Sequence, residues 1–312
     1  MSYLTITVIS DPVVNANARG KGVGNHSQLQ FITTPNGERT LLSSFAIKYA
    51  LRARMTLEGA TMWRHHDATK TMSRFGYGAS KAPTMLASPP TAPADYDDTI
   101  LFGYMIEAKE TKDASDPVDP VDPATPVVAP AAKKQAAKKD SNEVRRSYQE
   151  RSSCSIIPGY STSYFEGNAG FAQGHVASRE DLMPFTFDRH LTRYCYTVCL
   201  DLGTLKARPQ AVRKVLSAMQ GILVGGNQSS NRCAIVPEVL LWHVHEAPAS
   251  GLQVNEQYLN NFAVDLPITE DTLKPMREKC LNLGVTFEVA GLAGSPTVAE
   301  ALTQVIPNHI GF

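Results

Sequence analysis

Two serines and two cations occur close together near the start of a predicted helix. Ser43 and Ser44 precede a run with apolar residues at helical spacing, so either hydroxyl can cap the first free backbone N–H groups. Lys48 and Arg52 are four residues apart and therefore share one side of that helix. A capped helix N-terminus beside two cations can hold a phosphate. Spacing alone also fits an ordinary amphipathic helix with a solvated basic edge, and it favours that simpler interpretation.

A polar loop near the N-terminus carries further groups that can contact phosphates. It follows a β-branched segment at 3–9 that predicts a strand, and it contains Asn15, Asn17, Arg19 and Lys21. Its glycines form G-x-G-x-G, whereas a dinucleotide site needs G-x-G-x-x-G opening directly into a helix. Another extended segment comes first here, so we reject a Rossmann site. The loop is either a flexible basic segment or a backbone that lies close to a phosphodiester.

A second polar loop lies between a helix predicted to open at Pro209 and a strand predicted at 233–245. It follows the sequence Leu223-Val-Gly-Gly and contains Asn227, Ser229 and Arg232. These residues supply many hydrogen-bond donors and one cation.

Three arginines precede a group of aromatic residues in the middle of the chain. The arginines are Arg145, Arg146 and Arg151, and the aromatic residues include Tyr160, Tyr164 and Phe165. Arginine combined with aromatics is typical of surfaces that hold single-stranded nucleic acid. A glycine- and aromatic-rich hairpin whose rings simply pack is the alternative.

Two histidine pairs invite a metal-binding interpretation. Adjacent histidines such as His65 and His66 rarely chelate one ion without other ligands at suitable spacing. His243 and His245 share one face of a predicted strand, where a hydrogen-bonded or surface pair is the commoner arrangement. Spacing does not assemble a nucleophile, a base and an orienting acid either. We therefore predict no metal, no cofactor and no catalytic residues.

Composition points to a soluble cytoplasmic protein. The 312 residues include 30 basic and 30 acidic side chains, so any polyanionic partner must be held by local clusters. The five cysteines show no paired spacing, which favours reduced thiols over disulfides or structural zinc. The sequence shows neither a signal peptide nor an apolar run long enough to span a membrane.

The order of predicted elements favours an α+β fold. Two β–α–β halves across one antiparallel sheet would give a ferredoxin-like, RNA-recognition-motif core with inserted loops and a projecting hairpin. The run 97–106 reads as a buried strand, and the Ala-, Lys- and Pro-rich run 110–142 reads as low-complexity sequence. The predicted divisions are 1–55 (first half of the core), 56–98 (inserted module), 99–109 (core strand), 110–142 (low-complexity insertion), 143–190 (thumb-like segment) and 191–312 (second half of the core and C-terminal elements).

Four fragments together resemble a known family. They are Asn15-x-Asn17 after the first strand, Leu42-Ser-Ser-x-x-Ile-Lys-x-x-Leu-Arg52, Asp98-x-x-Leu-Phe-Gly-Tyr-Met105, and Leu223-Val-Gly-Gly-Asn227 before the strand that holds Pro237-Glu238. The combination is similar to the backbone subunit of type I CRISPR surveillance complexes (Cascade), in the DevR-type branch of type I-B systems. The insertion at 110–142 and the proline-rich stretch near 82–93 fall outside this resemblance.

The resemblance implies a non-catalytic subunit that polymerises along a CRISPR RNA (crRNA). It would grip the sugar–phosphate backbone, leave the bases to pair with target DNA, and contact other copies of itself and other Cascade subunits, with no membrane partner. The residues implied to contact RNA are Asn15, Asn17, Arg19, Lys21, Ser43, Ser44, Lys48, Arg52, Arg145, Arg146, Arg151, Asn227, Ser229 and Arg232. The residues implied to form the thumb are Tyr160, Tyr164 and Phe165. This chemistry is coherent, because a protein that accepts any guide sequence should contact phosphates and 2′-hydroxyls rather than bases.

Two alternatives remain at this point. An RNA-cleaving relative would use a loop aspartate to position a metal or a water, and Asp11 and Asp188 are the loop acids near the implied surface. A small-molecule enzyme on the same fold ranks last, because no catalytic constellation is evident.

Overall fold

The computed structural model describes most of the chain. The described ranges are 2–15, 26–27, 29–62, 96–103, 105–110, 144–149, 152–166, 169–175, 182–224, 233–246 and 256–312. Within them, only the backbone is described for residues 15, 26–27, 105–110, 144–149, 169–175, 182–187 and 256–257. The predictions for residues 63–95 and 111–142 therefore lie outside the described residues.

Within these ranges, seven strands form one antiparallel sheet in the order β16-β15-β1-β12-β8-β5-β4. The strands are β1 (Tyr3–Ser10), β4 (Phe31–Thr34), β5 (Gly37–Leu42), β8 (Cys154–Ser161), β12 (Tyr194–Asp201), β15 (Pro237–His245) and β16 (Glu288–Ala290). Two β–α–β units interleave here, β1–α1–β8 and β12–α4–β15, which gives the central order β15-β1-β12-β8 of a ferredoxin-like fold. The predicted α+β class is confirmed.

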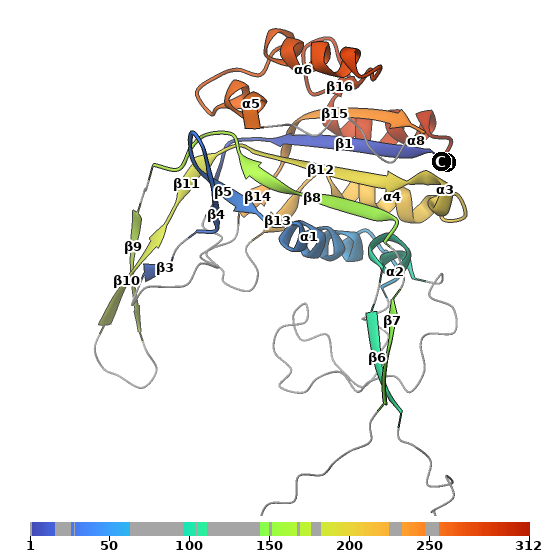
Figure 1. The fold of residues 1–312 in the computed structure, drawn as a ribbon, viewed down its shortest axis with the longest axis horizontal. Helices are drawn as coiled ribbons and strands as arrows, with labels where there is room; N and C mark the ends of the chain where they lie inside the picture. The colour runs from blue at the N-terminus through green and yellow to red at the C-terminus, as the bar shows by residue number, and fades with distance from the viewer. Residues whose placement is uncertain are drawn as a thin grey trace, which may run out of the picture.

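Helices cover both faces of this sheet (Figure 1). Even-numbered residues of β1, such as Leu4 and Ile6, pack with α1 (Ser44–Leu57) and α4 (Pro209–Ala218) in one apolar cluster. Odd-numbered Ile9 packs in a second cluster with η4 (Asn260–Phe262) and α6 (Glu270–Asn282). Because side chains alternate between the two faces of a strand, β1 contributes apolar side chains to both clusters, one on each face of the sheet.

Shorter elements surround the sheet. The helices are α2 (Asp97–Phe102), α3 (Leu202–Leu205), α5 (Glu256–Leu259), α7 (Val298–Glu300), the π-helix η5 (Ala301–Val305) and α8 (Ile306–His309). The strand pairs are β2 (Val13–Asn15) with β11 (His190–Thr192), β13 (Ile222–Val224) with β14 (Cys233–Ile235), and β6 (Met105–Glu110) with β7 (Val144–Gln149). A further hairpin of β9 (Ala169–His175) and β10 (Leu182–Asp188) has β3 (His26–Ser27) beside β10. None of the described helices has both the length and the apolar character needed to cross a bilayer.

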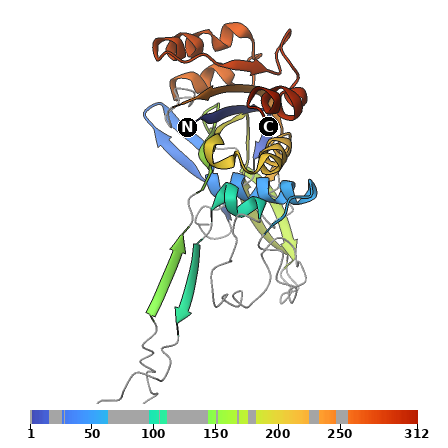
Figure 2. The ribbon, with the colours of Figure 1, turned by 90° about the vertical axis from the view of Figure 1, so that its right-hand side faces the viewer.

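The core strand predicted within 97–109 is wrong. Residues 97–102 form the helix α2, and β6 then pairs with β7 in a two-stranded stem that leaves the body (Figure 2). Asp97 and Asp98 lie in the first helical turn, where carboxylates are favourable, and Gly103 ends the helix at φ 65°. A short apolar run does not distinguish a buried strand from one turn of a buried helix.

The predicted thumb-like segment 143–190 also divides differently. β7 belongs to the stem and β8 to the central sheet, so only β9 and β10 form a projecting hairpin (Figure 1). The strand predicted at 233–245 is interrupted at Val236 and gives β14 and β15. The helix predicted to open at Pro209 ends at Ala218, and Leu223 belongs to the strand β13.

Candidate nucleic-acid interface

The fold brings together three segments that the sequence singles out for phosphate contacts. β2 ends at Asn15, where the first polar loop begins, and β2 contacts β14. β14 pairs with β13, so these two strands bracket the loop that contains Asn227. β13 in turn contacts α1, which begins at Ser44. Of the loop residues, Asn17, Arg19, Lys21, Asn227, Ser229 and Arg232 lie outside the described residues, as does Arg151.

The N-terminus of α1 has the predicted cap. Ser43 has an extended backbone, and its Oγ accepts from the backbone N of Ala46 at 3.2 Å. Ser44 is the first helical residue, and Phe45 beside it is 79% exposed. No acidic side chain occurs in the first turn. The positive end of this helix is therefore not neutralised by a carboxylate of its own first turn.

Lys48 and Arg52 turn from α1 towards α2. Lys48 Nζ donates to the carbonyl of Phe102 at 2.6 Å, and the two cations lie 5.4 and 5.0 Å from the Phe102 ring centroid. Arg52 Nε lies 4.0 Å from Asp98 Oδ2. Both side chains lie off the buried stripe of α1, as predicted. A phosphate at these cations would have to compete with their contacts to α2, and their role in RNA binding stays a prediction.

The structure corrects the location of the implied thumb and its base. Tyr160 lies in β8 of the central sheet, paired with Cys195 and Leu41. Arg145 and Arg146 lie in β7, opposite Lys109 and Ala108 of the stem, and not at the base of the β9–β10 hairpin.

Tyr164 and Phe165 lie on the leg of the chain that leads into β9. The guanidinium of Arg39 lies 4.1 Å from the Tyr164 ring centroid, and the Phe165 ring meets His190 edge-on at 5.5 Å. These aromatic rings therefore pack at the base of the hairpin and are not part of its two strands.

A buried polar network lies at that base and was not foreseen from the sequence. His190 Nδ1 lies 2.9 Å from Thr40 Oγ1, and its Nε2 lies 3.2 Å from Ser163 Oγ. Burial lowers the pKa of His190 to about 4, nearby Arg39 acts in the same direction, and a backbone hydrogen bond with Tyr164 opposes the shift. No local sequence pattern marks this network, because its members come from segments that are far apart in the chain.

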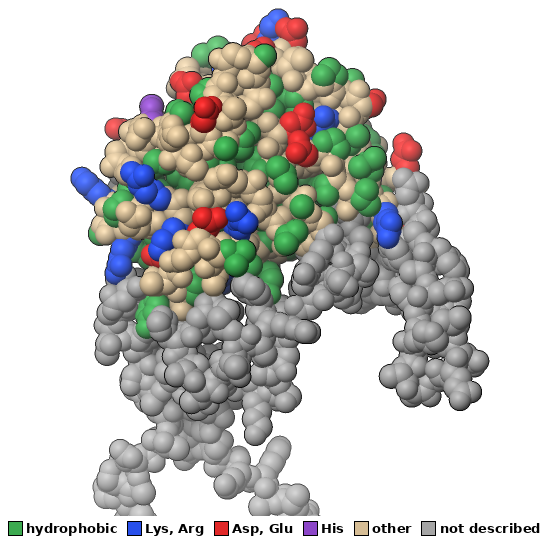
Figure 3. Space-filling view, turned by 180° about the vertical axis from the view of Figure 1, so that it is seen from behind, with side chains coloured by type: hydrophobic (Ala, Val, Ile, Leu, Met, Phe, Trp, Pro, Cys, Tyr) green, Lys and Arg blue, Asp and Glu red, His purple; other side chains and the backbone are tan. Residues whose placement is uncertain are grey.

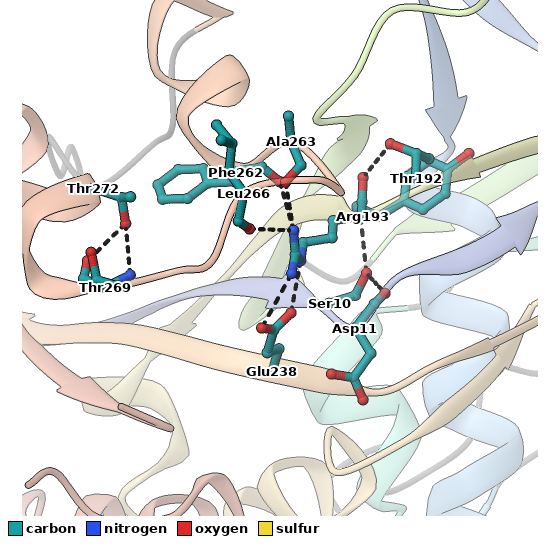
Figure 4. A network of polar contacts seen from close by, with 11 residues as sticks. Ser10, Asp11, Thr192, Arg193, Glu238, Phe262, Ala263, Leu266, Thr269 and Thr272 are labelled. Carbon is teal, nitrogen blue, oxygen red and sulfur yellow. Dashed lines mark hydrogen bonds and ion pairs between the residues drawn. The ribbon is translucent and has the colours of Figure 1, made fainter. Parts of the chain in front are cut away.

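Arg193 continues the network toward the C-terminal helices (Figure 4). Its Nε and Nη2 donate to the Glu238 carboxylate at 2.7 and 3.4 Å. Its Nη1 donates to the backbone carbonyls of Phe262, Ala263 and Leu266. Arg193 is 5% exposed and thereby fastens the turn after η4 to the sheet.

The two aspartates of the RNA-cleaving alternative have different surroundings. Asp188 is buried, and its Oδ2 accepts from the backbone N of Leu29 at 3.3 Å. Asp11 is exposed, and its pKa is raised by desolvation and by Glu238, with Arg193 opposing. Within the described residues, no group of three or more His, Cys, Asp or Glu side chains is placed to hold a metal ion.

The second histidine pair forms a ring stack. His243 and His245 stack at 4.6 Å, and Tyr3 stacks on His245 at 5.7 Å. His245 Nε2 is hydrogen-bonded to Thr5 Oγ1 at 2.9 Å. Burial lowers the pKa of His243 to about 4, and His245 adds to that shift.

Comparisons with known proteins bear on the fold. No family model matches the sequence, and no curated protein matches it. A solved structure described as a "CRISPR RNA-guided surveillance complex, pre-nicking" contains a chain with 11% identity and a TM-score of 0.53, and the match covers 99% of this chain and 100% of that one. Another, described as a "CRISPR RNA-guided surveillance complex", gives 10% identity and a TM-score of 0.52 over the same shares. At this identity the likeness shows a shared fold that extends over the whole of both chains.

Proposed function

We propose that this chain is the non-catalytic backbone subunit of a CRISPR effector, of the DevR type found in type I-B Cascade. In this proposal, copies of the chain assemble along a crRNA in the cytoplasm and hold its sugar–phosphate backbone. The bases remain free to pair with the target DNA strand, and the ends of the assembly meet other Cascade subunits.

The observation that carries the proposal is the meeting of three separate segments in space. The strand before the Asn15–Lys21 loop, the strands around the Asn227–Arg232 loop and the helix capped by Ser43 form consecutive contacts, β2 to β14, β14 to β13, and β13 to α1. Their side chains are hydroxyls, amides and a few cations, which suit phosphates and 2′-hydroxyls better than base edges. The fold shared with chains of RNA-guided surveillance complexes supports the same conclusion.

The proposal is tested by what purifies with the protein. The full chain is expressed together with the products of its neighbouring genes and a CRISPR array, and nucleic acid is extracted from the purified complex and sequenced. We expect RNA of uniform length that carries array-derived sequence. A complex that is free of nucleic acid, or that holds random RNA fragments, would contradict the proposal.

The RNA-cleaving alternative is separated by a second measurement on the same complex. Under the proposed non-catalytic role, we expect a complementary RNA target to stay intact in the presence of Mg²⁺. Cleavage that disappears in an Asp11→Asn variant, while guide RNA stays bound, would favour the alternative.

A further inference from the structure

The β9–β10 hairpin leaves the body on two legs, and buried polar contacts join both legs to the sheet. Ser163 lies on the leg before β9, and His190 and Thr192 lie on the leg after β10. Ser163 Oγ donates to Thr192 Oγ1 at 2.9 Å and lies 3.2 Å from His190 Nε2. Thr40 of β5 binds the other nitrogen of His190. One imidazole thus connects the two legs to each other and to the central sheet.

The side-chain contacts of this network allow one arrangement of the hydrogen atoms, in which the backbone hydrogen bond of His190 with Tyr164 shares the single ring proton. Thr192 Oγ1 donates its single proton to the carbonyl of Arg193 at 3.0 Å, so Ser163 must donate to Thr192. Ser163 Oγ can then only accept from His190, which places the ring proton on Nε2. Nδ1 must accept from Thr40.

Thr40 Oγ1 therefore accepts from the hydroxyl of Tyr194, at 2.6 Å. The chain of donors runs from Tyr194 through Thr40, His190, Ser163 and Thr192 to a backbone carbonyl. Each hydroxyl proton and the ring proton is thereby used, provided that the imidazole is neutral and in a single tautomer.

The network is largely buried, with only Ser163 partly exposed, so it restricts the legs more than a surface contact would. Thr40 and Thr192 are 0% exposed and His190 is 4% exposed. A buried hydroxyl that loses its partner pays the full cost of desolvation, which makes rearranged alternatives unfavourable. The neighbouring cation, Arg39, is itself fixed by Ser161 and Asn260, and it disfavours a charged imidazole.

We propose that His190 is a positioning residue that fixes the direction in which the β9–β10 hairpin leaves the body of the protein. The functional meaning of this direction rests on the proposed function, in which the direction of the hairpin sets where each copy meets the guide RNA and the next copy. Without the link through His190, both legs keep their backbone pairing, but the leg after β10 loses its side-chain bond to Thr40 of β5. The leg before β9 still holds β5 through Phe165 N, which donates to the carbonyl of Glu38 at 2.7 Å.

The test measures the distance between the hairpin and the body in full-length protein freed of RNA. Spin labels are placed by Gln173→Cys in β9 and Asp271→Cys in α6, in a Cys199→Ser background, because Cys199 is the native cysteine with partial exposure. The test variants are His190→Ala and Thr40→Val, which remove the ring and its bond to the sheet. We expect the distance distribution of both variants to become roughly twofold broader than that of the parent protein.

The matched control is Thr7→Val. Thr7 is a buried threonine of β1 in the same sheet, and its hydroxyl lies 2.9 Å from that of Thr197, away from the hairpin. We expect it to reduce stability to a similar extent and to leave the distance distribution unchanged. An unchanged distribution in Thr40→Val, or equal broadening in Thr7→Val, would overturn the inference. Thr40→Val decides the outcome alone if His190→Ala does not fold.

A second readout connects the inference to the proposed function without confusing the two. In guide-bound complexes, we expect nuclease protection of the RNA to lose its regular spacing in Thr40→Val and to keep it in Thr7→Val. If no RNA binds to any variant, the proposed function fails while the distance measurement still decides the role of His190. If RNA binds and the distance distribution of Thr40→Val stays as narrow as that of the parent protein, only the positioning role of His190 fails.

Discussion

At the scale of single residues, two buried arginines hold segments that are far apart in the sequence. Arg39 bonds Asn260, 221 residues away, and Arg193 bonds Glu238 and the turn at Phe262. A guanidinium suits these positions because its fork of five donors satisfies several acceptors at once, and it keeps its charge when buried. These side chains join the sheet to the C-terminal helices with directional contacts as well as with apolar packing.

Replacing Arg193 by Met tests that link. The change leaves the carbonyls of Phe262, Ala263 and Leu266 without this donor and removes the partner of Glu238. We expect the free energy of unfolding to fall by about 3 kcal/mol, because a partly buried carboxylate and several backbone carbonyls lose their buried donor together. Urea denaturation measures the loss, and hydrogen exchange should locate it in residues 256–283. Lys274→Met, which removes only the exposed pair with Asp271, should leave stability nearly unchanged.

The buried histidines predict how stability depends on pH. The pKa values of His190 and His243 are both lowered from 6.5 to about 4 in the folded protein. Between these values the unfolded chain binds protons that the folded chain does not, so stability is fully present above pH 6.5 and decreases as the pH falls toward 4. Each pKa unit contributes at most about 1.4 kcal/mol, and solvent screening reduces this figure.

Urea denaturation at a series of pH values through this range measures the effect. The variant His243→Gln, which cannot be protonated at that position, should lose stability less steeply with acidification than the parent protein. Identical slopes in the two proteins would show that His243 titrates normally.

At the scale of elements, α2 joins the body to the stem formed by β6 and β7. Lys48 of α1 binds the carbonyl at the end of α2, and Lys214 of α4 binds Asp97 in its first turn at 3.0 Å. The backbone N of Thr61 also donates to Asp97 at 2.9 Å. Cations from two different helices therefore hold α2 from both of its ends.

Two sets of variants separate the structural role of these cations from a role in RNA binding. One is the double variant Lys48→Ala with Arg52→Ala, and the other is the single variant Lys214→Ala. We expect each to lower the free energy of unfolding by about 1 kcal/mol and to increase hydrogen exchange in α2. Under the proposed function, only the double variant should also weaken guide binding. Filter binding measures the RNA affinity of the parent protein, the double variant and Lys214→Ala. Equal affinity in these three proteins would show that Lys48 and Arg52 serve only to hold α2.

The elements also show what the sequence can predict. The serine cap of α1 and the proline start of α4 are decided by neighbouring residues, and the structure has both. The prediction of a strand at 97–106 was wrong, because the run has too few apolar residues to distinguish the periodicity of a helix from that of a strand. The network around His190 joins Thr40 to a residue 150 positions away, and no local pattern encodes such a contact.

At the scale of the whole molecule, zero net charge limits how a nucleic acid can be held. Basic, acidic and hydrophobic side chains are mixed over the described surface seen from behind (Figure 3). Long-range attraction of the whole molecule to a polyanion is therefore weak, and binding depends on a few local phosphate contacts in each copy. Assembly of many copies on one RNA would then supply the overall affinity.

This leads to a prediction about salt. For a single strand, the logarithm of the binding constant falls with the logarithm of salt concentration by about 0.7 for each phosphate contact. We expect the slope per copy to correspond to a few contacts, and Arg232→Gln, in the β13–β14 loop, to reduce it by roughly 0.7. Lys274→Gln, on α6 beside Asp271, should leave it unchanged. Because both variants lower the net charge equally, a similar reduction in the two would mean that overall charge, and not a local phosphate contact, governs binding.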